Sequence, residues 1–237
     1  MKILFSLCFY FIAVCSFAQT SIVWERTLGG SKRESGYSIT LTKDGGSVVC
    51  IEAESDDGDV IKAGDYADFW IVKLSKDGII QWRKSFEGNG YDLPTSIIES
   101  IDGGLVVCGG THIVENETVN WAGNWDAWVI KLNFIGELEW ESKFGGRYND
   151  GANAITNSLN SISFVGTVTT NPITGYDAWI VNMLPNGTFN WSKTLTGNQN
   201  EIFSNVKQTN DNGLLCVGYT ASTTGDFGNG FGNEDGL

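Results

Sequence analysis

A tryptophan recurs through this 237-residue chain at nearly constant spacing. The positions, which lie 58, 58 and 51 residues apart, are Trp24, Trp82, Trp140 and Trp191. A second series with the same intervals consists of Trp70, Trp128 and Trp179, and each of its members is followed by a glycine turn and then a tryptophan of the first series. Self-similarity at a fixed period is the signature of a repeat architecture, in which each repeat is one supersecondary unit.

Each repeat contains four short segments with the composition of β-strands and no helical periodicity. In the second repeat these segments are 96–100, 105–109, 127–132 and 137–144. The third of them has apolar residues on both faces, which is typical of a sheet that is covered on both sides. Radially packed four-stranded sheets provide that cover, because each sheet lies between two neighbours. The sequence therefore predicts an all-β fold, namely a β-propeller of four-stranded blades with a 51–58-residue repeat.

The predicted blades form an incomplete array. Complete blades are expected over 37–86, 95–144 and 152–195, and a partial blade over 202–237, all within a propeller domain of residues 19–237. The last aligned strand begins at Asp235, whereas its equivalent beginning at Asp68 continues to Leu74. We therefore expect this chain to be a truncated piece of a longer protein. Alternatively, the strand around Trp24, which matches the fourth strand of a blade, pairs with the C-terminal strands and closes a ring. A parallel β-helix is the other fold considered, but its rungs are far shorter.

The repeat resembles a known family. Its pattern is Asp-x-Trp-(Ile/Val)-(Val/Ile)-Lys-Leu, then Gly, Trp and Gly-Gly, and then Asp-Gly-Gly, as at Asp126 to Leu132. This pattern is similar to the β-propeller repeat (SBBP) proteins that Bacteroidota secrete, and the likeness covers residues 22–237. The resemblance implies a propeller fold and export, often with a C-terminal type IX secretion sorting domain, which this chain does not show. Some relatives are labelled endoglucanases.

Residues 1–18 have the pattern of a secretory signal peptide. Lys2 is followed by an apolar run over 3–14, and the small residues Ser16 and Ala18 stand three places and one place before the expected cleavage site. A membrane anchor needs about 20 apolar residues, more than this run provides. A lipoprotein signal through Cys15 is an alternative. We expect a secreted protein, extracellular or on the cell surface, that does not span a membrane.

The charge balance and the histidine content exclude several function classes. The chain carries 15 basic and 28 acidic residues, for a net charge of -13, whereas nucleic-acid binding draws its affinity from clustered Lys and Arg. We therefore expect no nucleic-acid partner. His112 is the one histidine, which removes most triad and zinc chemistry, and no catalytic residue is assigned.

Two loops contain candidate binding residues. Trp121 and Trp125 lie outside the tryptophan period, in a loop where no packing register demands them, and they are the candidate ligand contacts. Asp56, Asp57 and Asp59 resemble a fragment of a calcium loop, although the spacing differs from the EF-hand pattern and a solvated loop tip is the alternative. No cofactor is expected, with calcium as the one ion to test.

Recurring acidic and cysteine positions are interpreted as structural. One acidic series precedes the first strand of each blade, where we expect carboxylates to accept backbone hydrogen bonds in a turn. It consists of Glu34, Asp92, Asp150 and Glu201. A second series begins the third strands, at Asp68, Asp126, Asp177 and Asp235. Equivalent positions in different blades lie too far apart for a disulfide. We therefore expect Cys50, Cys108 and Cys216 to be unpaired and buried.

Two function classes follow. The first is a secreted, non-catalytic propeller whose loops bind an extracellular glycan or protein. The second is a carbohydrate-active enzyme, such as an endoglucanase-like glycoside hydrolase, or its binding part, because glycoside hydrolysis needs only two carboxylates at a fixed separation.

Overall fold

The computed structural model describes residues 22–61, 65–88, 90–112, 125–227 and 235–236. All the regular structure within these residues is β. The first sheet contains β1 (Glu34–Leu41), β2 (Ser47–Ala53), β3 (Asp68–Leu74) and β4 (Ile80–Phe86). The second contains β5 (Asp92–Glu99), β6 (Leu105–His112), β7 (Trp125–Leu132) and β8 (Leu138–Phe144). The third contains β9 (Gly151–Asn157), β10 (Ile162–Asn171), β11 (Gly175–Met183) and β12 (Phe189–Leu195). The fourth contains β13 (Glu201–Gln208), β14 (Leu214–Thr220) and β15 (Asp235–Gly236).

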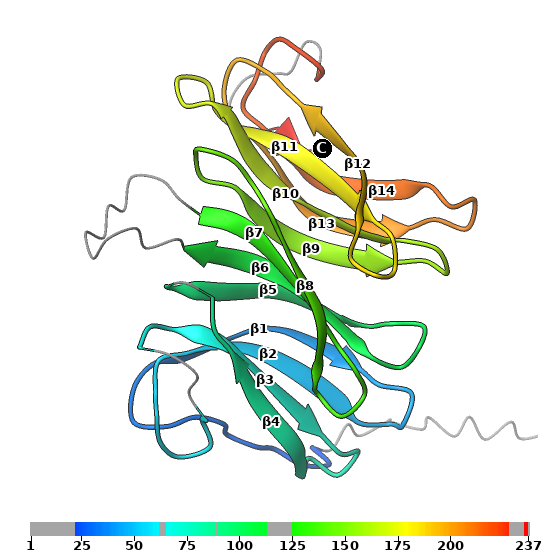
Figure 1. Ribbon diagram of the computed structural model, residues 1–237. Coiled ribbons are helices and arrows are strands. Elements are labelled where there is room, and N and C mark those ends of the chain that lie inside the picture. The colour runs from blue at the N-terminus through cyan, green and yellow to red at the C-terminus, as the bar shows by residue number, and fades with distance from the viewer. Residues whose placement is uncertain (1–21, 62–64, 89, 113–124, 228–234, 237) are drawn as a thin grey trace, which may run out of the picture.

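Each sheet is an antiparallel meander, in which every strand pairs with the next one along the chain. The first strands lie on the inner side of the array, because β1 contacts β5, β5 contacts β9, and β9 contacts β13. In Figure 1 the sheet of β1–β4 lies at the bottom, that of β5–β8 lies above it, and the third and fourth sheets lie at the top. The predicted all-β propeller of four-stranded blades, present as an incomplete array, is confirmed. We therefore call the sheets blades one to four.

Apolar side chains from facing surfaces join the blades. Between blades one and two, Cys50 and Phe69 belong to the same buried cluster as Ile97 and Trp128, and the rings of Phe69 and Trp128 lie 4.6 Å apart. Similar clusters join blade two to blade three and blade three to blade four. Every residue of β3 is buried, which explains why its sequence is apolar on both faces.

Three of the four periodic tryptophans pack on a turn of the blade that follows them, whereas Trp191 is 41% exposed. Each of the three indoles lies against the glycine of a β-turn in the following blade, where φ is between +76° and +81°. A Cβ on any of these glycines would lie within 3 Å of the indole, so the turn needs glycine both for its conformation and for space. The pairs are Trp24 with Gly78, Trp82 with Gly136, and Trp140 with Gly187.

The closing strand around Trp24, the alternative to truncation, is absent from the described residues. Residues 22–33 contain no strand, and within the described residues the fourth sheet has only three strands. Trp24 nevertheless occupies its repeat position, because its Nε1 donates to the carbonyl of Lys76 at 2.9 Å. Indole packing on the neighbouring turn therefore forms here without backbone pairing.

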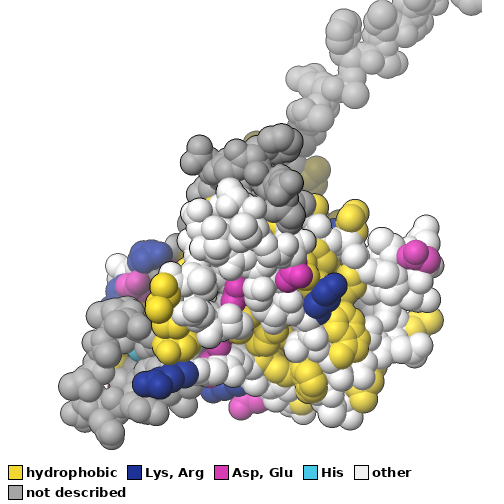
Figure 2. Space-filling view, turned by 90° about the horizontal axis from the view of Figure 1, so that it is seen from above, with side chains coloured by type: hydrophobic (Ala, Val, Ile, Leu, Met, Phe, Trp, Pro, Cys, Tyr) yellow, Lys and Arg dark blue, Asp and Glu magenta, His cyan; other side chains and the backbone are white. Residues whose placement is uncertain are grey.

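The end blades expose side chains that are buried between inner blades. Ile39 of blade one is 63% exposed, whereas its repeat equivalent in blade two, Ile97, is 3% exposed. In blade four, Leu215 and Val217 are 61% and 47% exposed. The view from above in Figure 2, over the end of the array where β11, β12 and β14 lie, shows hydrophobic side chains gathered at the surface. Both end faces thus present apolar surface of the kind that joins the blades.

The three cysteines of the described residues are free, as predicted, but one burial prediction is wrong. Cys50 and Cys108 are buried and Cys216 is only half-buried. In the strand ladders Val217, not Cys216, occupies the position of Cys108. A shift of one residue turns a strand side chain to the opposite face, so Cys216 packs against the cluster between blades three and four. Val217 takes the position of Cys108 and is 47% exposed, because no described blade covers that face.

Candidate functional site: an aromatic cavity between blades two and three

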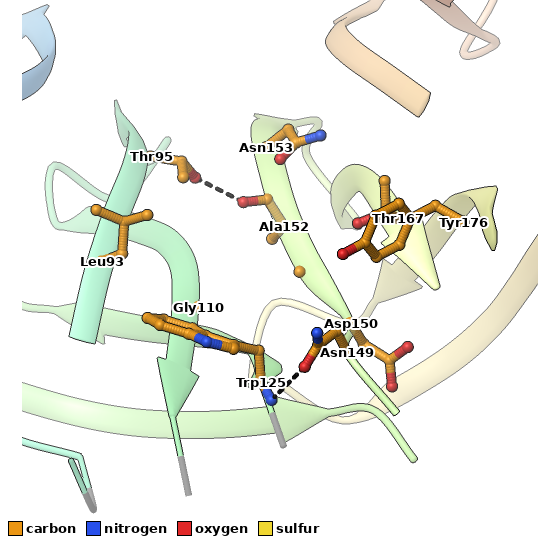
Figure 3. Close-up of a pocket in the computed structure, with 11 residues that line it drawn as sticks. Leu93, Thr95, Gly110, Trp125, Asn149, Asp150, Ala152, Asn153, Thr167 and Tyr176 are labelled. Carbon is orange, nitrogen blue, oxygen red and sulfur yellow. Dashed lines mark hydrogen bonds between the residues drawn. The ribbon is translucent and has the colours of Figure 1, made fainter. Parts of the chain in front are cut away.

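A cavity of about 290 Å³ lies between blades two and three, beside the start of β9 (Figure 3). Its lining combines aromatic rings, amides and small residues. Strands β5, β6 and β7 of blade two contribute Leu93, Thr95, Gly110 and Trp125. Blade three and the loop before β9 contribute Asn149, Asp150, Gly151, Ala152, Asn153, Thr167 and Tyr176. The described lining residues include no Lys or Arg and one carboxyl, Asp150, so the lining offers no basic partner to an anionic ligand.

Trp125 and Tyr176 occupy the same repeat position in successive blades. Each stands directly before the aspartate of the recurring motif, where blade one has Ala67. Trp125 is half-buried, and its ring lies edge-on to His112 at 5.5 Å and over Gly110, which leaves room for it. Tyr176 is 37% exposed. In Figure 3 the two rings lie on opposite sides of the start of β9.

Each aromatic residue is held by an asparagine at one repeat position. The backbone N–H of Trp125 donates to Oδ1 of Asn149 at 3.3 Å, and that of Tyr176 donates to Oδ1 of Asn200 at 2.9 Å. The carbonyl of Trp125 also accepts a hydrogen bond from the N–H of Asp150 at 2.7 Å. These bonds cross from one blade to the next, so the site is built on the rigid contact between blades.

Asp150 of the cavity is engaged by the backbone. Its Oδ2 accepts from the N–H of Gly146 at 2.6 Å, and its Oδ1 accepts from the N–H of Thr169 at 2.8 Å. Burial raises the pKa of Asp150 above its usual value, the two backbone hydrogen bonds oppose this, and the nearby carboxylate of Asp126 raises it further. The predicted role of this acidic position, as an acceptor of backbone hydrogen bonds in a turn, agrees with this geometry.

The same arrangement recurs at the start of other blades. The carboxylate of Glu34 accepts from the N–H groups of Gly30 and Ser55 at 3.0 and 3.1 Å, and Asp92 accepts from the N–H of Gly88. Burial also raises the pKa of Glu201, which lies near Asp177. An acidic residue of this kind recurs at the start of each blade, and those of blades two to four lie near the aspartate at the start of the third strand of the preceding blade. We therefore assign these carboxylates to the architecture.

Of the two predicted ligand contacts, Trp125 lines the cavity and Trp121 lies outside the described residues. The calcium candidates have separate partners. Asp57 accepts from the N–H of Ser31 at 2.7 Å, Asp59 lies 3.1 Å from Arg83, and Asp56 lies 4.0 Å from Lys32. The described part of the chain contains no group of three or more acidic, histidine or cysteine side chains placed to hold a metal. The choice between a solvated loop tip and a calcium loop is left to a binding experiment.

Sequence reasoning missed Tyr176 and Asn149. The available signal was the repeat register, since Trp125 and Tyr176 both precede the motif aspartate by one residue, and Asn149 and Asn200 both precede the turn carboxylate by one. Treating Trp125 as a residue outside the tryptophan period concealed this equivalence.

Comparisons with known proteins leave the family open. No family model matches the chain, and no curated protein matches it. Among solved structures, it is similar to a protein of unknown function from Bacteroides caccae, with 15% identity and a TM-score of 0.49. That match covers 83% of this chain and 56% of the other one, so the chain spans little more than half the length of that protein. No helix long and apolar enough to cross a membrane occurs among the described residues.

Proposed function

We propose that the protein is a secreted, non-catalytic β-propeller that binds a neutral glycan in the cavity between blades two and three. The observation that carries the proposal is the convergence of Trp125 and Tyr176 on one cavity that also offers amide groups. The C–H face of a pyranose ring packs on an aromatic face, and its hydroxyls need hydrogen-bond partners that amides supply. The volume of about 290 Å³ suits a group the size of one sugar ring.

The charge of the protein supports a neutral ligand. The net charge is -13, and the carboxyl of Asp150 is part of the cavity lining. An anionic polysaccharide would meet repulsion from both. Export through the signal peptide at 1–18, a location outside the cell, and membership of the SBBP-like propellers with their type IX secretion are further parts of this proposal. They rest on the sequence patterns given above.

The glycan proposal is tested by titrating the protein with neutral hexasaccharides of glucose, xylose and mannose while tryptophan fluorescence and heat are recorded. We expect one of these sugars to bind, and Trp125→Ala to weaken its binding about ten-fold or more, as loss of a buried aromatic contact does. Trp191→Ala is the matched control, because Trp191 is 41% exposed on the outer strand β12. Equal affinities of the two variants, or no binding of any sugar, would contradict the proposal.

The alternative of a glycoside hydrolase is tested on the same sugars. Release of new reducing ends by the wild-type protein, lost in Asp150→Asn, would favour the enzyme. We expect binding without turnover, because both oxygens of Asp150 already accept backbone hydrogen bonds.

A further inference from the structure

The cavity between blades two and three continues into two others. A cavity of about 260 Å³ shares Asn149 and Tyr176 with it, and is also lined by Tyr148, Thr169, Pro172 and Gly175. A third cavity, of about 290 Å³, shares Pro172 and Gly175 with the second, and reaches Asn198, Gln199 and Asn200 before blade four. Each cavity shares lining residues with the next, so the three lie beside one another from blade two to blade four, and we call them together the groove.

The groove repeats one chemical unit. At the boundary of blades two and three, an aromatic residue and an asparagine bonded to its backbone, Trp125 and Asn149, border the groove. One repeat later, Tyr176 and Asn200 form the same pair; Tyr176 lines the first and second cavities and Asn200 lines the third. Two like subsites in line match a ligand that is itself a repeat of like units.

The lining of the whole groove is nearly uncharged. The residues of its three cavities include five amide side chains and no Lys or Arg, and Asp150 is their one carboxylate. A polysaccharide chain presents hydroxyls at every unit, and amides can both donate to them and accept from them. Extended peptides offer no such regular set of hydroxyls.

We propose that this groove binds a neutral oligosaccharide chain, with one sugar unit between Trp125 and Tyr176 in the first cavity and later units along the cavities that lead to Asn200. This inference rests on the proposed function and names its ligand class, a polymer longer than one sugar. Linking two weak subsites through one ligand raises affinity, because the second contact forms within the complex.

The test compares chain lengths of the sugar that binds in the hexasaccharide screen. Affinities of the mono-, di-, tri- and hexasaccharide are measured by calorimetry for the wild-type protein. We expect the hexasaccharide to bind at least about ten-fold more tightly than the monosaccharide. Equal affinities per molecule for all lengths would overturn the groove and leave the single-cavity function standing, whereas failure of every sugar in the hexasaccharide screen would overturn the proposed function itself.

A longer ligand can bind more tightly merely because it offers more identical units to a single site. A variant far from the first cavity distinguishes that effect from binding along the groove. Gln199 lines the third cavity only, so Gln199→Ala is expected to weaken hexasaccharide binding several-fold and to leave monosaccharide binding unchanged. Gln81→Ala, an exposed glutamine on β4 of blade one, is the matched control and is expected to change neither. Thermal unfolding of each variant confirms that it is folded. A hexasaccharide affinity that Gln199→Ala leaves unchanged would overturn the inference.

Discussion

Nζ of Lys131 lies 2.9 Å from Oδ2 of Asp102, which stands in the turn between β5 and β6 of the same blade. Lys131 is 2% exposed, and its stem lies inside the blade. The second glycine of the Asp-Gly-Gly turn, Gly104, leaves room for the ammonium group. Blade one repeats the arrangement with Lys73 and Asp44 at 2.9 Å. The turn and the lysine of the recurring motif are therefore two halves of one contact.

Removing the carboxylate of this pair should destabilise the protein. Asp102→Ala leaves the buried ammonium of Lys131 with Glu139, 2.8 Å away, as its remaining carboxylate, and the loss is expected to be about 1–3 kcal/mol. Asp77→Ala removes the exposed ion pair with Lys76 and should cost less than about 0.5 kcal/mol. Urea unfolding of both variants measures the difference. Equal losses would show that the Lys131 contact contributes no more than a surface pair.

Burial between blades should decide the cost of an isoleucine. Ile97 and Ile39 share one repeat position, but they are 3% and 63% exposed. Ile97→Ala is expected to lower the free energy of unfolding by about 2–5 kcal/mol, because it opens a cavity between blades one and two. Ile39→Ala should change it by less than about 0.5 kcal/mol. A large effect of Ile39→Ala in dilute solution would mean that the end face of blade one is covered.

The repeat made most of the fold predictable. Strand pairing follows from fixed turn residues, and the periodic tryptophans marked blade contacts because each blade has the same neighbour. Where the repeat is irregular, predictions from the sequence failed, as for the burial of Cys216. Cys216 stands one residue out of register, and the third blade has Asn182 in place of the lysine, where its amide donates to the hydroxyl of Ser163 in β10 at 2.8 Å. Only an aligned backbone shows such shifts.

Of the residues that line the candidate site, the sequence predicted only Trp125. Trp125 was found because it departs from the tryptophan period, but its partners come from other blades and lie far from it in the sequence. Asn149 and Tyr176 reach the same cavity only because the β9 strand packs beside β7. The composition and spacing of residues do not predict which loops of neighbouring blades lie in contact.

Two glycines with the same backbone conformation should differ in their tolerance of alanine. Gly103 has φ +84° and no atom within 4 Å of an added Cβ, whereas Gly136 has φ +80° and the ring of Trp82 at 2.9 Å. Gly103→Ala is expected to cost about 1–2 kcal/mol, from backbone strain alone. Gly136→Ala should cost more, because the indole of Trp82 must also move. Equal losses in chemical unfolding would show that the indole packs loosely.

A pH-dependent stability is expected from Asp92, which is 1% exposed. Burial raises the pKa of Asp92 to about 7, and the carboxylate of Asp68 contributes in the same direction, while the charge of Lys143 opposes it. The unfolded chain has an aspartate pKa near 3.9. Because the folded pKa is the higher one, the folded state holds the proton more tightly. Its contribution to stability is complete below about pH 4 and is lost as the pH rises through about 7.

Asp92→Asn removes this titration and keeps an oxygen that can accept from the N–H of Gly88. The variant should therefore gain stability relative to wild type as the pH rises from 5 to 8, as measured by urea unfolding at each pH. Asp211→Asn is the control, because Asp211 is exposed and its hydrogen bond from Thr209 lowers its pKa. Asp211 stays ionised throughout that range, so its variant should follow wild type. Parallel curves for Asp92→Asn and wild type would show that Asp92 is already ionised in the folded protein at pH 5.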